Sequence, residues 1–394
     1  MLEQYLSINP KVEYLPEYNP KAETGWEGVK ALWYECAKYE GKPTKVFAYI
    51  GYPDVKEGTK VPAIVLVHGG GGHAFAHWVK KWNDRGYAAI AMDTEGYFPA
   101  EDKKGLTGIE GEPKEWYVHE LYGSLKDETY TVGPCNDEMK NPEIAVSEQW
   151  IYHAIATTIL AHNILLADER VDETKIGITG VSWGSVITSL AIGYDSRYAF
   201  AIPIYGSAYL EYADTNVCRG FKNSKTREQW SAADRLTNAQ FPILWYCGLY
   251  DAAFCSYSNS LSYLDTKATG SYISIQEDLM HSHVDAWNRA EGYHFADCVL
   301  NGKKPFITVE EGTSAICIPE GHEDVKARLL YFTEDFQFNE ESQPMNKAKI
   351  IPVDIEGNTM KVEVPQGAFC YYIEFTSKVN GVEIVSTTEW FKKN

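Results

Sequence analysis

Several absences in the sequence narrow the functions open to it. The eight cysteines form no C-x-x-C pair and have no histidine-rich neighbourhood, so the sequence predicts neither a zinc site nor a disulfide framework. There is no long basic cluster, and the net charge is −19. A nucleic-acid or anionic-membrane partner would require a cationic surface, so neither partner is expected. A neutral substrate fits this charge better than a polyanion.

Membrane and export signals are missing as well. No apolar run reaches the length of about 18 residues that a membrane-spanning helix requires. The first ten residues lack a basic region followed by an apolar run, so they do not predict a signal peptide. Together with scattered, unpaired cysteines, these features predict a cytoplasmic protein with reduced thiols.

The sequence does contain a regular alternation of strand and helix patterns. Nearly continuous apolar runs at 61–67, 87–92, 200–205 and 241–247 are typical of strands that are buried on both faces. Helical patterns lie between them, and the longest, at 149–168, has the spacing of an amphipathic helix. This alternation predicts an α/β protein with a doubly wound, mostly parallel sheet.

Four regions depart from that alternation. Residues 1–30 are polar and dotted with proline, so they predict an N-terminal arm in front of a main domain at 31–305. Within that domain, the long stretches 95–147 and 206–240 are predicted to be lids or binding loops. Short alternating strands separated by Asn-Gly or Pro-Gly turns predict a small β-sandwich at 320–394.

The most informative stretch is the pentapeptide G-V-S-W-G at 180–184, which lies between a predicted strand and a predicted helix. This order is the nucleophile elbow of an α/β-hydrolase, with Ser182 as the nucleophile. The serine must occupy a sharp, strained turn, and a side chain two positions before or after it would collide with the neighbouring strand and helix. The competing interpretation is a structural turn that happens to contain a serine.

A glycine-rich loop follows the predicted strand at 61–67. It reads H-G-G-G-G-H, and its free backbone N–H groups are suited to bind an oxyanion. We predict Gly70 as one donor, with Gly71 as the close alternative, and Trp183 as the second donor because it follows the nucleophile. His68 is expected to support the loop through hydrogen bonds. The alternative, a phosphate-binding loop, does not fit, because the sequence has neither G-x-x-x-x-G-K-[ST] nor G-x-G-x-x-G followed by an acidic residue for a ribose.

The acid and the base of a catalytic triad also have candidates in the expected order. Asp251 follows the predicted strand at 241–247, and its rivals are Asp265 and Asp278. The base is His281 or His283, which follow the next strand. Counting from the strand favours His281, and counting back from the following helix favours His283, so both remain open. This triad chemistry requires no metal and no organic cofactor.

Several of these motifs resemble one branch of the α/β-hydrolases. They are the G-V-S-W-G elbow with the preceding D-E-T-K-I-G-I-T-G, the H-G-G-G-G loop, the M-H-S-H stretch with Trp287, and the early strands at 39–49. The resemblance is to acetyl xylan esterases and dienelactone hydrolase-like proteins, and it covers roughly residues 25–305. It implies an esterase that removes acetyl groups from a carbohydrate.

The leading functional prediction is therefore a serine esterase that hydrolyses short-chain esters, acetyl above all, of a carbohydrate or another small alcohol. Trp150 and Trp230 are predicted to bind the substrate, since indole rings stack well on sugars. One alternative is a serine peptidase of the prolyl-oligopeptidase type. Another is a catalytically silent hydrolase fold that binds a glycan or a protein.

Overall fold

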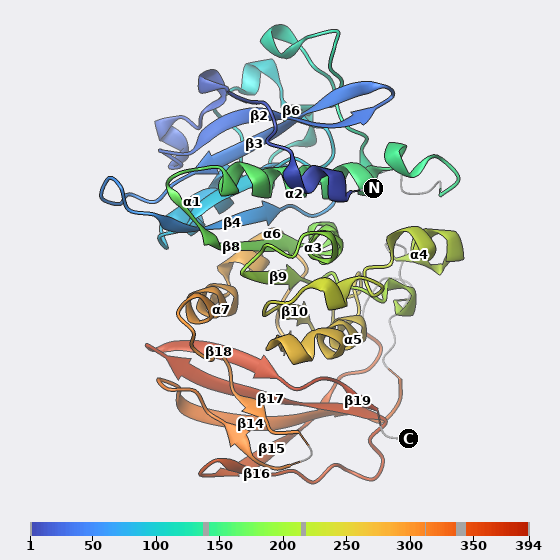
Figure 1. The fold of residues 1–394 in the computed structure, drawn as a ribbon. Coiled ribbons are helices and arrows are strands. Elements are labelled where there is room, and N and C mark those ends of the chain that lie inside the picture. The colour runs from blue at the N-terminus through green and yellow to red at the C-terminus, as the bar shows by residue number, and fades with distance from the viewer. Residues whose placement is uncertain (1, 137–141, 214–217, 312, 336–343, 393–394) are drawn as a thin grey trace.

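The computed structural model describes residues 2–136, 142–213, 218–311, 313–335 and 344–392. Its main feature is a mixed sheet of 15 strands, with helices packed on both faces (Figure 1). The N-terminal and C-terminal segments contribute strands to opposite ends of this sheet. The predicted α/β class is confirmed.

The middle of the sheet consists of six neighbouring strands that pair in parallel. In spatial order these are β5 (Ala88–Met92), β4 (Val61–Val67), β8 (Val171–Val181), β9 (Phe200–Ile204), β10 (Leu244–Gly248) and β11 (Tyr272–Gln276). Apart from the exposed start of β8, their side chains are almost all buried, as expected from continuous apolar runs. The carboxyl ends of parallel strands share one edge, so the loops that follow them lie close together.

Antiparallel strands flank this parallel core on both sides. The N-terminal side has β1 (Val12–Tyr14), β2 (Lys30–Tyr39) and β3 (Lys42–Gly51). The C-terminal side has β18 (Val382–Thr387), β17 (Cys370–Val379), β14 (Glu323–Phe332), β15 (Lys349–Glu356) and β16 (Thr359–Lys361), with β19 (Phe391–Lys392) on β17. The predicted "mostly parallel" pairing therefore applies to the middle of the sheet, and the whole sheet is mixed.

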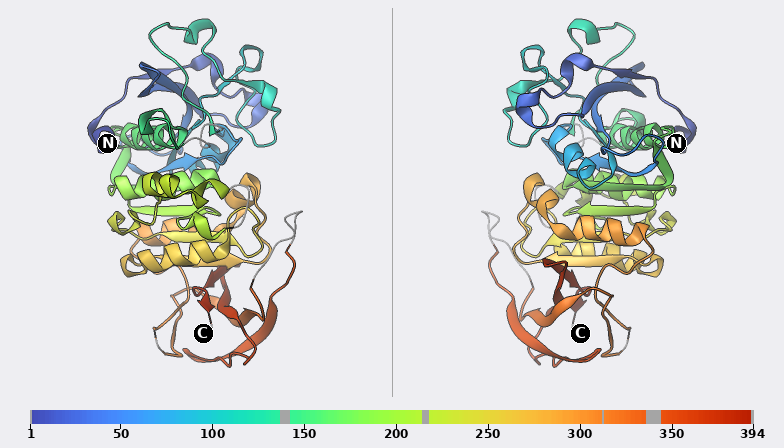
Figure 2. Two further views of the ribbon diagram at one scale, coloured as in Figure 1. Left: turned by 90° about the vertical axis from the view of Figure 1, so that its right-hand side faces the viewer. Right: turned by 90° about the vertical axis from the view of Figure 1, so that its left-hand side faces the viewer.

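The helices cover two faces of the sheet (Figure 2). One face carries α2 (Trp150–Leu166), α3 (Trp183–Tyr194) and α5 (Ser256–Thr266), and the other carries α1 (Ala76–Asn83), α6 (His283–Asn288) and α7 (Ala290–Leu300). Aromatic contacts join the helices of the second face: Trp78 of α1 lies 5.4 Å from Trp287 of α6, measured between ring centroids. The doubly wound arrangement is the predicted one.

Helix α2 is buried on nearly all sides, which differs from the amphipathic pattern expected for it. The reason is that the N-terminal segment covers its outer face. The amide of Asn163 donates hydrogen bonds to the carbonyl oxygens of Tyr5 and Ile8, both at 2.7 Å. The ring of Tyr5 also packs edge-on against that of Tyr152. The N-terminal segment therefore shields the outer face of α2 from solvent.

Arg197 fastens this N-terminal segment. Its guanidinium donates to the carbonyl of Leu6, to the Asn163 side chain and to the buried carboxylate of Asp195, at 2.7–2.8 Å. Because Arg197→Ala leaves these acceptors without their charged donor, we expect the free energy of unfolding in urea to fall by about 2 kcal/mol. Arg170 makes a two-point ion pair at the surface, and Arg170→Ala should cost under about 1 kcal/mol. Equal losses in the two variants would contradict this role of Arg197.

The structure does not show the separate sandwich that was predicted for 320–394. The C-terminal strands continue the central sheet, because β18 pairs with β11 through Thr387 and Ile273. They do enclose a second hydrophobic core, to which β13 (Ile316–Cys317) contributes Ile316 and against which Val309 of β12 (Thr308–Val309) packs. That core contains Ile307, Ile316, Ala327, Leu329, Val353, Met360, Ile373 and Phe375. The alternating pattern predicted the strands, but it carried no information about their pairing with β11.

The two predicted lid stretches are long excursions with little regular structure. The first contains the strand pair β6 (Phe98–Pro99) and β7 (Tyr117–Val118), and the second contains the short helix α4 (Ser224–Trp230). Residues 137–141 and 214–217 of these stretches lie outside the described residues. Both stretches lie near the loops that follow the parallel strands, as the contacts below show.

Three general findings bear on the remaining predictions. All eight cysteines are free thiols. Within the part of the chain that the structure describes, every helix is too short or too polar to cross a membrane. In the same part, no three or more His, Cys, Asp or Glu residues are grouped in a way that could hold a metal ion.

Candidate active site

Ser182 occupies a strained turn between β8 and α3. Its backbone has φ 58° and ψ −121°, a conformation that residues with a side chain rarely adopt. The strand ends at Val181 and the helix begins at Trp183, so the turn consists of the serine alone. This is the strand–turn–helix geometry that the pentapeptide predicted.

The two glycines of the pentapeptide sit where no side chain fits. A Cβ atom on Gly180 would overlap the carbonyl oxygen of Gly184 and the hydroxyl of Thr188. A Cβ atom on Gly184 would overlap the carbonyl oxygens of Val67 and His68 at the end of β4. The structure thus identifies the atoms with which a side chain at either position would collide. All of them except the Thr188 hydroxyl are backbone atoms, which cannot rotate away.

Ser182, His281 and Asp251 form a continuous hydrogen-bonded series. His281 Nε2 lies 2.9 Å from Ser182 Oγ, and His281 Nδ1 lies 2.7 Å from Asp251 Oδ2. The other oxygen of Asp251 accepts from the backbone N–H groups of Ala253 and Phe254, at 2.7 and 3.0 Å. A carboxylate only accepts hydrogen bonds, so Nδ1 carries the proton and Nε2 is left to accept from the serine hydroxyl.

The rival carboxylates have other partners. Asp265 accepts a hydrogen bond from the hydroxyl of Tyr209, and Asp278 pairs with Arg289. Among the described contacts, neither carboxylate reaches His281. The structure therefore brings together Ser182, Asp251 and His281 out of the sequence-predicted candidates.

Two aromatic side chains hold the imidazole of His281. The ring of Phe254 stacks on it at 5.9 Å, and the ring of Tyr205 lies 4.8 Å away at a tilt of 33°. Tyr205 also donates a 2.5 Å hydrogen bond to the carbonyl of Met280, the residue before His281. Its backbone has φ 72°, a strained value for a tyrosine. This role was not predicted, because Tyr205 is the last residue of an apolar run that is typical of a buried strand.

His68 braces the glycine-rich loop, as expected. Its Nδ1–H donates to the carbonyl of Gly69 at 2.7 Å, and its Nε2 accepts from the backbone N–H of Thr94 at 2.9 Å. Burial lowers the pKa of His68 to about 4, against a weaker opposing effect of the nearby Asp93 carboxylate. The ring is therefore neutral near pH 7, which suits one donor and one acceptor nitrogen.

The N–H groups of the glycine loop differ in availability. Gly69 N–H donates to His283 Nε2 at 2.8 Å, and Gly71 N–H donates to Glu95 Oε1 at 3.2 Å. In the described part of the chain, no acceptor bonds to the N–H of Gly70 or to that of Trp183, the first residue of α3. The prediction of Gly71 as an oxyanion donor does not fit, because Glu95 already occupies its N–H.

His283, the alternative base, has both ring nitrogens occupied away from the serine. Its Nδ1 lies 3.1 Å from Glu110 Oε1, and its Nε2 accepts from Gly69 as described. Burial alone would raise the pKa of Glu110, but hydrogen bonds from His283 hold it below the usual value. His283 therefore contacts the glycine loop, whereas His281 contacts Ser182.

Comparison with known proteins identifies the fold. Residues 143–296 match the prolyl oligopeptidase family. The structure superimposes on an acetyl xylan esterase from Paenibacillus sp. R4 with a TM-score of 0.50, at 15% identity, over 75% of this chain and 90% of that chain. The protein has the α/β-hydrolase fold. The resemblance to α/β-hydrolases seen in the sequence is thereby confirmed.

Two other solved structures give slightly lower TM-scores. Acetyl xylan esterase 1 from Thermoanaerobacterium sp. JW/SL YS485 gives a TM-score of 0.49 at 15% identity, over 76% of this chain and 92% of that chain. The acylaminoacyl peptidase of Pyrococcus horikoshii gives 0.48 at 18% identity, over 73% of this chain but only 43% of that chain. No curated protein sequence matches this chain significantly.

Trp150 and Trp230 do not present their rings to a substrate. Their side chains are only 1% and 2% exposed, respectively. The indole N–H of Trp150 donates to the carbonyl of Thr94, and that of Trp230 donates to the Gln149 side chain. The predicted substrate contact therefore does not fit their burial. Trp150 instead packs edge-on against the indole of Trp183.

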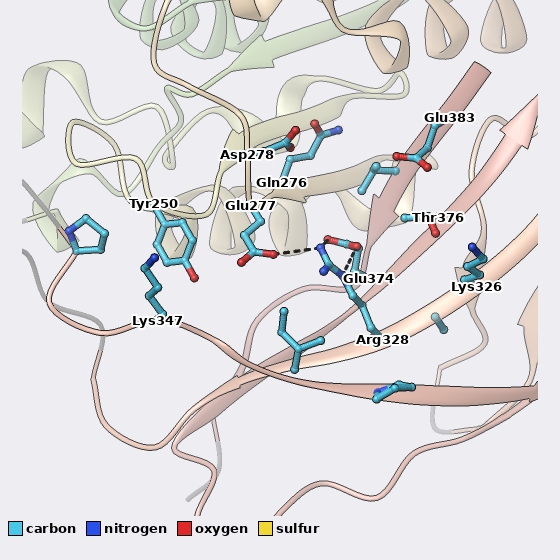
Figure 3. Close-up of a pocket in the computed structure, with 15 residues that line it drawn as sticks. Tyr250, Gln276, Glu277, Asp278, Lys326, Arg328, Lys347, Glu374, Thr376 and Glu383 are labelled. Carbon is cyan, nitrogen blue, oxygen red and sulfur yellow. Dashed lines mark hydrogen bonds and ion pairs between the residues drawn. The ribbon is translucent and has the colours of Figure 1, made fainter. Parts of the chain in front are cut away.

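A large concavity lies where the C-terminal strands meet the parallel core of the hydrolase fold (Figure 3). Its volume is about 880 Å³. Arg328 crosses it and pairs with Glu374 at 2.6 Å and with Glu277 at 3.2 Å. Glu277 follows β11, whereas Arg328 and Glu374 lie on C-terminal strands, so the Arg328–Glu277 pair joins the two parts of the sheet. Asp278, on its rim, lies three residues before His281.

Proposed function

We propose that this protein is a serine hydrolase that cleaves short acyl esters, acetyl esters above all, of a carbohydrate or a similar neutral alcohol. The observation that carries the proposal is the hydrogen-bonded series Ser182–His281–Asp251, together with two backbone N–H groups that have no acceptor among the described residues. A nucleophile, a base, an orienting acid and oxyanion donors are the four parts that acyl transfer requires.

In the proposed acylation step, Ser182 Oγ attacks the carbonyl carbon of the ester. His281 Nε2 accepts the hydroxyl proton, and Asp251 stabilises the resulting imidazolium. The carbonyl oxygen becomes an oxyanion that accepts hydrogen bonds from the N–H groups of Gly70 and Trp183, each worth about 3 kcal/mol in the transition state. When the C–O bond breaks, His281 returns the proton to the departing alcohol oxygen.

Deacylation repeats these steps with water. His281 Nε2 removes a proton from water as its oxygen attacks the acyl carbon, and the same two N–H groups stabilise the second oxyanion. The bond to Ser182 Oγ then breaks, the serine recovers its proton from His281, and the carboxylic acid leaves. The chain's own side chains supply every proton transfer in this cycle.

We also propose that the stretches 95–147 and 206–240 shape the substrate pocket. Three contacts support this role: Glu95 accepts from Gly71, Glu110 accepts from His283, and Phe221 stacks on the indole of Trp183 at 6.3 Å. The first two contacts come from the first stretch and the third from the second. Both stretches therefore touch residues next to Ser182 or its glycine loop.

Peptide hydrolysis is the second candidate, because residues 143–296 match the prolyl oligopeptidase family. The ester proposal has two supports of its own. The superposition with the acetyl xylan esterase from Paenibacillus includes 90% of that esterase, so the likeness extends beyond the elbow region. Residues before β4 contribute strands β1, β2 and β3 to the central sheet, and thus do not form a separate gating domain within this chain.

Chain-length selectivity tests the proposal. We expect kcat/KM for p-nitrophenyl acetate to exceed that for the octanoate at least about tenfold, with butyrate between them, since a small acyl site excludes extra methylene groups. Release of acetate from an acetylated xylo-oligosaccharide should be detectable as well. The measurement is initial rates on all substrates under one set of conditions.

An N-acetylated aminoacyl p-nitroanilide serves as the peptidase comparison. Faster cleavage of the anilide than of the acetate ester, at equal concentration, would replace the esterase proposal by the peptidase. No cleavage of any substrate would favour the silent scaffold instead.

A further inference from the structure

His283 connects two segments of the chain that meet at the glycine loop. Its ring lies between Gly69, which follows β4, and Glu110, which belongs to the stretch 95–147. The His283 side chain is 12% exposed and that of Glu110 is 25% exposed, so water competes only weakly for these bonds. The ring is thus held at both of its nitrogens.

Glu110 determines which nitrogen of His283 carries the proton. Its Oε1 lies 3.3 Å from the backbone nitrogen of His283 and 3.1 Å from Nδ1 of the same residue, and it can only accept from both. Nδ1 is therefore the donor, and Nε2 keeps the lone pair that accepts from Gly69 N–H at 2.8 Å. A proton on Nε2 would face that N–H and break the bond.

The peptide that joins Gly69 to Gly70 is held from its other side. The carbonyl of Gly69 accepts from His68 Nδ1 at 2.7 Å and from the N–H of Gly72 at 2.9 Å. A trans peptide is planar, so fixing this carbonyl directs the N–H of Gly70 to the opposite side. Glycine has little intrinsic preference of its own, and such peptides flip easily unless both neighbours are anchored.

Gly69 itself lies against the nucleophile. A Cβ atom placed on it would come within 3.0 Å of both Ser182 Cβ and His283 Nε2, and within 2.9 Å of the Val181 carbonyl. The backbone that His283 holds is therefore the backbone that borders Ser182. A shift of Gly69 would move the adjacent Gly70 N–H relative to the serine.

We propose that His283, oriented by Glu110, is a positioning residue that fixes the Gly69 backbone so that the N–H of Gly70 is presented to the oxyanion. This inference rests on the proposed serine hydrolase function. It gives the second histidine of the M-H-S-H stretch a defined role next to the first. It also gives a role to the contact between Glu110, in the stretch 95–147, and His283, which binds the glycine loop.

Glutamine and leucine at position 283 separate this role from others. The amide oxygen of glutamine can lie close to the place of Nε2 and accept from Gly69 N–H, whereas leucine cannot accept. We expect His283→Leu to lower kcat for p-nitrophenyl acetate by about 10- to 100-fold with KM within about twofold, because an oxyanion donor is misaligned. His283→Gln should recover most of that loss.

Each other outcome has its own meaning. If His283→Gln is as inactive as His281→Gln, position 283 supplies the base and the positioning role is wrong. If His283→Leu keeps wild-type kcat, the glycine loop does not depend on this bond and the inference is also wrong. A wild type that hydrolyses no ester and reacts with no fluorophosphonate would instead overturn the proposed function.

A second variant tests the same role without changing position 283, in case substitutions there prevent folding. Glu110→Ala should lower kcat by about tenfold, since the ring of His283 is then free to change tautomer. Glu115→Ala, an exposed carboxylate in the same stretch, is the matched control and should keep wild-type kcat. Thermal unfolding of each variant, measured beside its activity, identifies any loss that comes from an unfolded fraction. Equal activity of the two glutamate variants would contradict the role of Glu110.

Discussion

Replacing Ser182 by alanine is expected to lower kcat for ester hydrolysis on the order of a millionfold, or to background. The side chain supplies both the attacking oxygen and the proton that His281 accepts at 2.9 Å. Its loss leaves only the N–H groups of Gly70 and Trp183 and any binding of the substrate. In serine hydrolases such remnants accelerate the reaction on the order of a thousandfold over water.

The measurement is initial rates with p-nitrophenyl acetate together with covalent labelling by a fluorophosphonate. Wild type should be labelled at Ser182, and the alanine variant should not be labelled. Asp251→Asn should reduce kcat on the order of ten-thousandfold, because the amide no longer holds Nδ1 of His281 as a donor. If Ser182→Ala kept more than about 1% of the activity, Ser182 would not be the nucleophile.

Ser189→Ala provides the matched control. Ser189 is a buried serine on α3 whose hydroxyl donates to the carbonyl of Ser185 at 2.9 Å. Removing that single hydrogen bond should change stability by about 1 kcal/mol and leave kcat within about threefold of wild type. Comparing the two variants separates the specific role of Ser182 from the general effect of removing a serine hydroxyl in this region.

Gly184→Ala is expected to lower kcat about a thousandfold or more and to destabilise the fold by about 3 kcal/mol. The new methyl group would overlap the carbonyl oxygens of Val67 and His68, so α3 must move away from the end of β4. That movement displaces Ser182 and the N–H of Trp183 together. Activity with p-nitrophenyl acetate and unfolding in urea are the two measurements.

Gly292→Ala is the control for this substitution. Gly292 lies in helix α7, where an added Cβ would meet only the Ile202 side chain, at 3.7 Å, an ordinary contact distance. Alanine favours the helix over glycine, so stability should stay constant or rise by up to about 1 kcal/mol, with kcat unchanged. Wild-type activity of Gly184→Ala would mean that the elbow tolerates a side chain and would contradict the steric argument.

The local features of the site were the ones that the sequence could predict. The turn at Ser182 depends on its own neighbours in the chain, so the spacing of Gly180 and Gly184 was enough to indicate it. The placement of Asp251 after β10 follows from strand order in the same way. These predictions required only the period of the apolar residues and the direction of parallel strands.

The features that were missed depend on contacts between distant segments. His281 and His283 are two residues apart, and only the path of the chain between β11 and α6 directs one to Ser182 and the other to Gly69. Gly71 lost its predicted role because Glu95, which follows β5, occupies its N–H. Trp150 was assigned to the substrate because nothing in its neighbourhood revealed that the Thr94 carbonyl would accept from it.

In the fold as well, local features were predicted and contacts between distant segments were not. The parallel middle of the sheet was predicted because each buried strand carries its own apolar run. The union of β18 with β11 was not predicted, because it joins Thr387 to Ile273 across more than a hundred residues. Strand pairing over such separations leaves no periodic mark in either segment.

The pairing of β18 with β11 has a consequence for how the chain is made. Strand β11 is the last of the parallel strands, and before β18 is synthesised one of its sides has no partner. An unpaired strand edge offers N–H and C=O groups to any other extended chain, and is therefore a site for aggregation. Strand β18 covers this edge, so a nascent chain in which β18 has not yet formed leaves β11 open to such pairing.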